Sequence, residues 1–247
     1  MMIPMSARPT VVAIDGPSGA GKGTVARALA EALDFRYVDT GAMYRALAWK
    51  ARHDGVDLQD APAVAAVAAR AVFELERRVA IDGHDVTAEI RTAELDTAAA
   101  IVARHPDVRR VLVERQRQFG TTDALAGRAG LVMEGRDIGT VVFPDADVKV
   151  FLDATPDERA KRRATDAAHA AGRSASAARV AQELAARDQS DRTRAVSPLT
   201  RAGDAVYIDT TGTPVAEVVG RVVDIVRRAL DRDEVPGSGF RVPGSGS

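Results

Sequence analysis

A glycine-rich run near the N-terminus of this 247-residue chain reads Gly16-Pro17-Ser18-Gly19-Ala20-Gly21-Lys22-Gly23-Thr24. The apolar residues 11–15 before it predict a buried strand, and residues 22–33 after it repeat apolar side chains at helical spacing. Glycines in this arrangement let the backbone curl until several N–H groups face one anion, and the start of a helix adds its dipole. The run therefore predicts a loop that binds a nucleoside triphosphate, with Lys22 directed at the outer phosphates.

One position departs from the general phosphate-loop motif. That motif places Ser or Thr directly after the lysine, whereas this chain has Gly23 there and Thr24 one residue later. The hydroxyl that usually contacts magnesium is therefore expected to be absent or to act indirectly.

Beyond the loop, short apolar runs alternate with helical stretches, which predicts a parallel sheet with helices on both faces. Further strands are expected at 36–39, 130–134, 148–153 and 205–209, and helices at about 42–52, 156–171, 177–187 and 214–230. The region 56–123 has a different pattern of predicted elements. Short strands are expected at 73–76 and 79–81, the pair Asp82-Gly83 predicts a turn, and a helix at 108–119 follows. This region is interpreted as an insertion with its own small sheet.

Composition excludes several classes of protein. The chain has no cysteine, a net charge of −1 and no apolar run long enough to span a membrane. Without a positive field we expect no nucleic-acid partner, and without a signal sequence we expect a cytoplasmic location. The four histidines share no metal-ligand spacing and are interpreted as structural.

Two further runs narrow the class of phosphate-loop enzyme. One is Asp39-Thr40-Gly41-Ala42-Met43-Tyr44-Arg45 and the other is Gly135-Arg136-Asp137-Ile138-Gly139-Thr140-Val141-Val142-Phe143-Pro144-Asp145-Ala146. Together with the glycine-rich run, and in this order, they resemble nucleoside monophosphate kinases, and most closely the bacterial cytidylate kinases. The similarity also includes residues 89–92 and 187–188, and it extends from about residue 11 to residue 209.

The resemblance implies an α/β P-loop kinase fold: a five-stranded parallel sheet flanked by helices, an inserted monophosphate-binding region with a small antiparallel sheet, and a short lid. One kinase domain is expected over 9–231, with its core at 9–55 and 128–231, the insertion at about 56–127 and the lid at about 159–173. A disordered Gly/Ser-rich tail is expected at 232–247. The family also suggests a monomer.

The implied reaction converts ATP and CMP or dCMP into ADP and CDP or dCDP, with Mg²⁺ as Mg-ATP. Thr40, Arg45 and Arg136 would hold the acceptor phosphate, Arg109 and Asp137 the cytosine, and Arg187 and Asp191 the sugar. Residues 16–24 would bind ATP. The implied catalytic cations are Lys22, Arg162, Arg163 and Arg194. Glu134, at the end of a strand beside the phosphate loop, is the candidate to organise Mg²⁺ through water.

Base recognition can be argued from chemistry. Asp137 can accept from the amino group of cytosine, while an arginine can donate to the ring acceptors. Uracil presents a carbonyl where cytosine has its amino group, so the carboxylate would disfavour UMP. The family has a serine where this chain has Ala100. We therefore expect weaker base discrimination here than in relatives with the serine.

Plainer interpretations exist for several of these residues. On spacing alone, Arg187 and Asp191 would be a surface ion pair, the two arginines at 162–163 a solvated face, and Thr40 a helix cap. Two other functions also stay open. One is a P-loop kinase for UMP, AMP or a non-nucleotide acceptor. The other is a regulatory switch, although the chain contains no asparagine and hence no Asn-Lys-x-Asp guanine motif.

Overall fold

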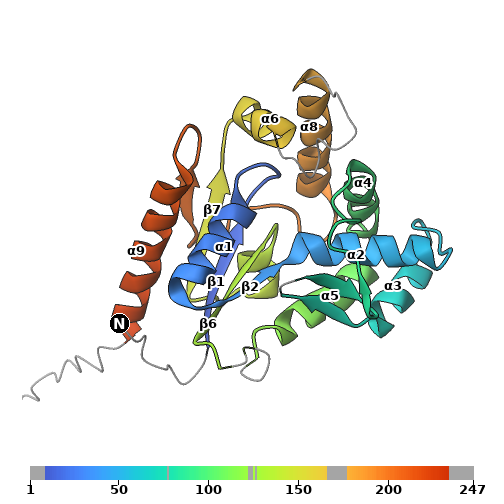
Figure 1. Cartoon of the computed structure of the whole chain (residues 1–247), viewed down its shortest axis with the longest axis horizontal. Coiled ribbons are helices and arrows are strands. Elements are labelled where there is room, and N and C mark those ends of the chain that lie inside the picture. Colours follow the sequence, from blue (N-terminus) through green and yellow to red (C-terminus); the bar gives the residue numbers. More distant parts are fainter. Residues whose placement is uncertain (1–8, 77, 122–124, 126, 166–176, 234–247) are drawn as a thin grey trace, which may run out of the picture.

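A computed structural model of the chain describes residues 9–76, 78–121, 125, 127–165 and 177–233 (Figure 1). Its central sheet has the strand order β2-β6-β1-β7-β8, and every neighbouring pair is parallel. The strands are β1 Thr10–Asp15, β2 Arg36–Asp39, β6 Gly130–Gly135, β7 Val148–Asp153 and β8 Val206–Asp209. All five strands were predicted from the sequence to within one residue at each end.

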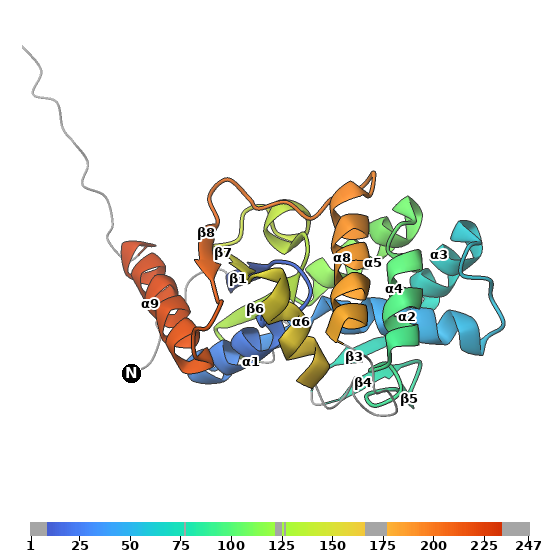
Figure 2. The same ribbon diagram turned by 90° about the horizontal axis from the view of Figure 1, so that it is seen from above.

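Both faces of this sheet are buried. On β1, Val12 and Ile14 pack into a core with α1 (Lys22–Leu33) and α9 (Val215–Asp233). The alternate residue Ala13 faces a second core, built against α2 (Thr40–His53) and α5 (Pro106–Gln118). Figure 2 shows α1 and α9 together on one side of the sheet. Two buried faces explain why the central strands β1 and β6 are largely apolar, without polar alternation.

The insertion contains more structure than its sequence predicted. Antiparallel strands β3 (Phe73–Leu75) and β4 (Val79–Ile81) are confirmed, and a third strand, β5 (His84–Asp85), pairs with β4 across the turn at Asp82-Gly83. Helices α3 (Ala61–Arg70) and α4 (Ala93–Val102) were not predicted. Both helices are N-capped, since Asp60 accepts from Ala63 N–H and Thr92 accepts from Leu95 N–H.

Several predicted boundaries were wrong. Helix α2 begins at Thr40 rather than 42, because the Asp39 carboxylate caps it. Helix α8 (Ala177–Thr193) continues six residues beyond the predicted end. Helix α6 is described as Pro156–Thr165, so the rest of the predicted helix and lid lies outside the described residues. Helix α9 runs through Asp233, past the predicted domain end at 231, and 234–247 are not described.

The segment after β6 forms η2 (Ile138–Val142), one turn of π-helix. No helix in the described part of the chain is long and apolar enough to cross a bilayer.

Candidate active site

A cavity of about 1140 Å³ opens at the carboxyl ends of β1, β2 and β6. In an open parallel sheet this edge is where ligands bind. The phosphate loop forms one wall, and α2, α4, α5, α6, α8 and the start of α9 contribute to the others. Every predicted site residue lines this cavity except Gly16 and Pro17, which lie behind it in the loop.

The phosphate loop presents its backbone to the cavity. Gly19 has φ 79°, a left-handed conformation, and a Cβ there would lie 3.0 Å from Cβ of Arg159. Helix α1 begins at Lys22 with no side-chain cap, which leaves its first N–H groups available to an anion. The Lys22 ammonium donates to Pro17 O at 2.8 Å. Burial and the nearby Arg136 lower the pKa of Lys22, and the negative charge of Glu134 acts in the opposite direction.

Gly23 gives a physical reason for the departure from the general motif. A Cβ at this position would lie 2.8 Å from Glu134 Oε1. The same carboxylate oxygen accepts from the Tyr37 hydroxyl at 3.1 Å, which holds it beside the loop. Burial and then Asp39 raise the pKa of Glu134 above its ordinary value. The missing side chain at position 23 therefore makes room for a carboxylate supplied by β6.

Thr40 does not cap helix α2. Its hydroxyl donates to Glu134 O at 2.7 Å, and the cap is Asp39, which accepts from Ala42 N–H at 2.9 Å. Asp39 also accepts from Arg45 at 3.1 Å. Thr40, which directly follows β2, is thus hydrogen-bonded to the end of β6. Asp39, the last residue of β2, orients Arg45 toward the cavity.

Arg109 and Asp137 form a buried ion pair, with side chains 2% and 8% exposed. Arg109 comes from α5 and lies over the Tyr44 ring, with its guanidinium carbon 5.5 Å from the centroid. Asp15, which sequence reasoning left unassigned, fixes the backbone after Asp137 by accepting from Ile138 N–H and Gly139 N–H, both at 2.8 Å. The last residue of β1 therefore positions the loop that carries Asp137.

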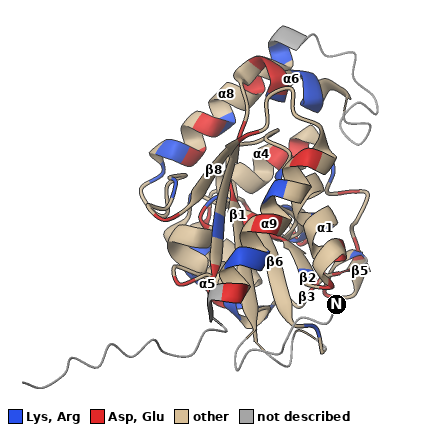
Figure 3. Ribbon diagram, turned by 90° about the vertical axis from the view of Figure 1, so that its left-hand side faces the viewer, with Lys and Arg blue, Asp and Glu red and all other residues tan. Residues whose placement is uncertain are grey.

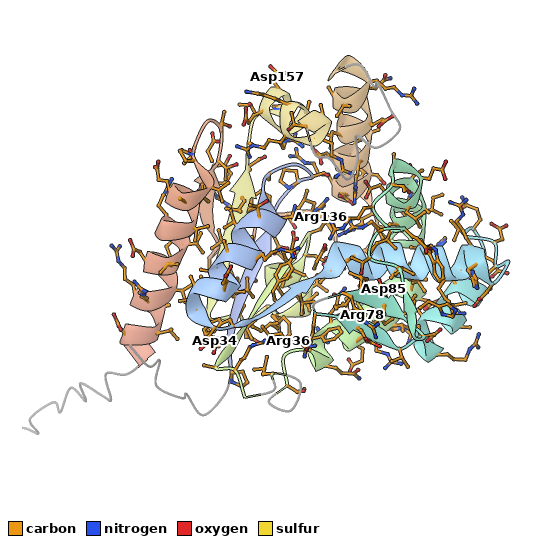
Figure 4. All side chains as sticks on the ribbon, viewed as in Figure 1. Asp34, Arg36, Arg78, Asp85, Arg136 and Asp157 are labelled. Carbon is orange, nitrogen blue, oxygen red and sulfur yellow. The ribbon has the colours of Figure 1, made fainter. Side chains whose placement is uncertain are left out.

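Arg187 and Asp191 are not the surface ion pair that their spacing suggested. Asp191 accepts from Arg136 at 2.8 Å and lies 3.6 Å from Arg194. Burial alone would raise the pKa of Asp191, but Arg136 and Arg187 outweigh it and the pKa lies below its ordinary value. Arg136 lies between the start of α1 and α8 (Figure 4).

A carboxylate that sequence reasoning missed accounts for Arg187. Asp96 on α4 lies 3.1 Å from Arg187 and 3.8 Å from Arg45, and it also accepts a hydrogen bond from Arg163. The other predicted lid arginine, Arg162, donates to the hydroxyl of Thr210 at 2.9 Å and to its carbonyl at 2.6 Å. Neither arginine at 162–163 is a freely solvated side chain.

Arg159 and Asp188 hold the phosphate loop from the side of α6 and α8. Arg159 donates to Ser18 O at 3.2 Å and is paired with Asp188, which accepts from Ser18 N–H at 3.4 Å. Both residues are buried. Arg159 stood in a charged helical stretch and Asp188 in a run shared with the family, but no local pattern indicated that they meet at Ser18.

Several donors around the cavity have no hydrogen-bond partner. Among the described residues, these buried atoms include Arg45 Nε, Arg109 Nε and Arg194 Nη2. Such donors suit a ligand rich in acceptors. No group of three His, Asp or Glu side chains in the described ranges could by itself hold a metal ion.

Comparison with known proteins identifies the family of this chain. The sequence model of the cytidylate kinase family matches residues 12–228. A cytidylate kinase from Desulfitobacterium hafniense (strain Y51) is 48% identical over 218 residues, which are 87% of this chain and 91% of the relative. The cytidylate kinase of Pelotomaculum thermopropionicum is 50% identical over 86% of this chain and 93% of its own length. A bifunctional pantoate ligase/cytidylate kinase from Prochlorococcus marinus (strain MIT 9303) is 43% identical over 98% of this chain, which is 48% of that protein. The chain belongs to the cytidylate kinase family.

Proposed function

We propose that this protein transfers the γ-phosphate of ATP to CMP or dCMP, giving ADP and CDP or dCDP. The observation that carries the proposal is that one cavity joins the phosphate loop to the buried pair of Arg109 and Asp137. The same cavity can therefore hold a triphosphate at the phosphate loop and a base at the buried pair. The family relationship supports the same reaction.

Phosphoryl transfer asks little covalent chemistry of a protein. It requires two anionic substrates in line and cations around the oxygens of the transferred group. In our proposal, residues 16–24 bind ATP, and Lys22, Arg162, Arg163 and Arg194 face the transferring phosphate. Thr40, Arg45 and Arg136 hold the acceptor phosphate, and Arg187 and Asp191 contact the sugar. All these cations line the cavity.

Cytosine would be read by the buried pair. Asp137 accepts from the amino group of the base, and Arg109 donates to its acceptors. The pairing of Arg109 with Asp137 holds both side chains in place before a nucleotide arrives. The unpartnered Arg109 Nε is a further donor that a bound ligand can satisfy.

Magnesium fits the side chains at the loop. Mg²⁺ is commonly held by one or two carboxylates together with water and substrate phosphates. Glu134 supplies one carboxylate beside Gly23, where no side chain intervenes. When bound, Mg²⁺ would neutralise charge on the phosphates, and Glu134 would hold it through water. We also infer a cytoplasmic monomer with the single-domain organisation and the short lid at 159–173 expected from the sequence.

The test is an ADP-release assay with Mg-ATP and CMP, dCMP, UMP or AMP added separately. We expect strong turnover with CMP and dCMP, weaker turnover with UMP and negligible turnover with AMP. Lys22→Ala should lower turnover by about two orders of magnitude or more, because it removes a cation from the transferring phosphate. Lys50→Ala is the matched control, since Lys50 lies outside the cavity and pairs with Asp54.

Two outcomes would overturn the proposal in different places. Turnover with none of the four monophosphates, while ATP still binds, would remove the acceptor assignment. A near-normal rate for Lys22→Ala would remove the role of the phosphate loop.

A further inference from the structure

Asp96 lies where arginines from three different helices meet. It is on α4 and only 8% exposed. Arg45 comes from α2, Arg163 from α6 and Arg187 from α8, and α4 and α8 lie side by side (Figure 2). Oδ1 of Asp96 faces Arg187 at 3.1 Å and Arg45 at 3.8 Å, while Oδ2 accepts from Arg163. One carboxylate on α4 therefore connects this helix to α2, α6 and α8 beside the cavity.

Around Asp96 the positive charges outnumber the negative charges. Within the described part of the chain, no other carboxylate lies within salt-bridge distance of Arg163 or Arg187, and Arg45 has Asp39 as its second partner. Three guanidinium groups thus share two carboxylates, and one positive charge remains unbalanced. A cluster with this surplus favours a further anion, and the dianionic phosphate of a nucleoside monophosphate has the matching charge.

We propose that Asp96 is a positioning residue for the acceptor phosphate, an inference that rests on the proposed function. Three like charges on long, flexible side chains repel one another and separate into solvent unless a counter-ion gathers them. Asp96 supplies that counter-ion from inside the protein, so the arginines stand assembled before the substrate arrives. Because Arg163 belongs to α6 and Arg45 to α2, the same carboxylate sets the distance between the lid side and the acceptor side of the cavity.

A purely structural interpretation of Asp96 makes a different prediction. If the carboxylate only fastened α4 to α8, its loss would lower the stability of the protein without a selective effect on the acceptor. If it gathers the arginines, a small free carboxylate placed in the gap should replace it. Asp96→Ala leaves such a gap, whereas Asp96→Asn fills the gap with a neutral amide of nearly the same shape.

The experiment measures KM for CMP and for ATP, kcat and the melting temperature of the full-length wild-type chain and both variants, with and without added formate. For Asp96→Ala we expect KM for CMP to rise about tenfold or more, the scale set by losing a hydrogen bond between charged groups. KM for ATP should change far less. Formate should recover part of the lost affinity of Asp96→Ala, whereas Asp96→Asn should show the same loss without recovery. Glu94→Ala, an exposed residue on the same helix, should match the wild type.

The outcomes separate the two proposals. If the wild-type protein does not phosphorylate CMP, the proposed function fails, and the effect of CMP alone on the melting temperatures of wild type and variants still tests Asp96. If the wild-type protein is active but both Asp96 variants keep its KM for CMP, the positioning role is overturned. The positioning role is also overturned by a second result. In that result both variants lose stability, KM for CMP and KM for ATP change by similar factors, and formate restores neither KM.

Discussion

At the scale of single residues, Ala100 is a site where one atom should alter specificity. It lines the cavity on α4, one turn after Asp96. A serine here adds one neutral hydrogen bond, whose net contribution is about 0.5–1.5 kcal/mol. We predict that Ala100→Ser increases the preference for CMP over UMP by about two- to tenfold. The measurement is the ratio of kcat/KM for the two acceptors, and an unchanged ratio would show that position 100 does not contact the base.

Tyr37 is a second residue where a single substitution should have a measurable effect, in this case on the pH dependence of activity. Its hydroxyl donates to Glu134, and this hydrogen bond lowers the pKa of a carboxyl that burial raises. Tyr37→Phe removes the donor, so the pKa of Glu134 should rise further and the ionised form should be lost at a higher pH. If activity needs that ionised form, the acid limb of the kcat/KM profile moves to higher pH.

The control for this prediction is Tyr207→Phe, because Tyr207 is half exposed and distant from the cavity. If the pH profiles of Tyr37→Phe and the wild type coincide, the ionisation of Glu134 does not control activity.

At the scale of elements, the pairing of Arg159 on α6 with Asp188 on α8 connects two helices to the phosphate loop at Ser18. Both side chains are 9% exposed, so removing one partner leaves a buried, unpaired charge. We predict that Asp188→Ala lowers the free energy of unfolding by about 3 kcal/mol or more. Glu183→Ala on the same helix breaks an exposed pair with Arg179 and should cost less than about 1 kcal/mol. Urea denaturation of both variants checks this, and equal losses would contradict it.

The elements also show where sequence patterns inform and where they do not. The central strands β1 and β6 were predictable because burial on both faces makes them largely apolar along their length. Helix α3 was missed because Ala61–Arg70 consists largely of alanine and valine, which gives little contrast between faces, although Asp60 and Pro62 marked its start. Helix α8 was predicted too short because Arg187 and Asp191, which line the cavity, and Asp188, which binds the phosphate loop, look like a polar ending.

At the scale of the whole molecule, the cavity has walls from the sheet, from the insertion and from α6 and α8. Helices α6 and α8 carry acidic and basic residues together (Figure 3), so their contacts can exchange one charged partner for another. We predict that a non-hydrolysable ATP analogue and CMP together slow amide hydrogen exchange in α4 and α6 more than either nucleotide does alone. Helix α3, which contributes no residue to the cavity, serves as the internal control. Equal protection by one nucleotide and by both would argue against joint closure.

The residues that line the cavity were easier to predict from the sequence than the residues that hold those side chains in place. Lys22, Arg45 and Asp137 stand in runs with a recognisable order, so their meeting at one sheet edge could be expected. Asp96 and Tyr37 stand in no such run. Their parts depend on side chains more than 60 residues away along the chain, such as Arg163 for Asp96 and Glu134 for Tyr37. Contacts of this kind are a product of the fold and leave no local pattern.

The pairing of arginines with carboxylates around the cavity bears on the design of inhibitors. A compound that relies on negative charge must compete with Asp137 and Asp191 for guanidinium groups that are already engaged. Its affinity will therefore weaken as ionic strength increases. A neutral compound that offers a donor to Asp137 and an acceptor to Arg109 addresses the most deeply buried pair, where salt has little access. Selectivity in a chemical series should accordingly come from the part of the cavity lined by Arg109 and Asp137.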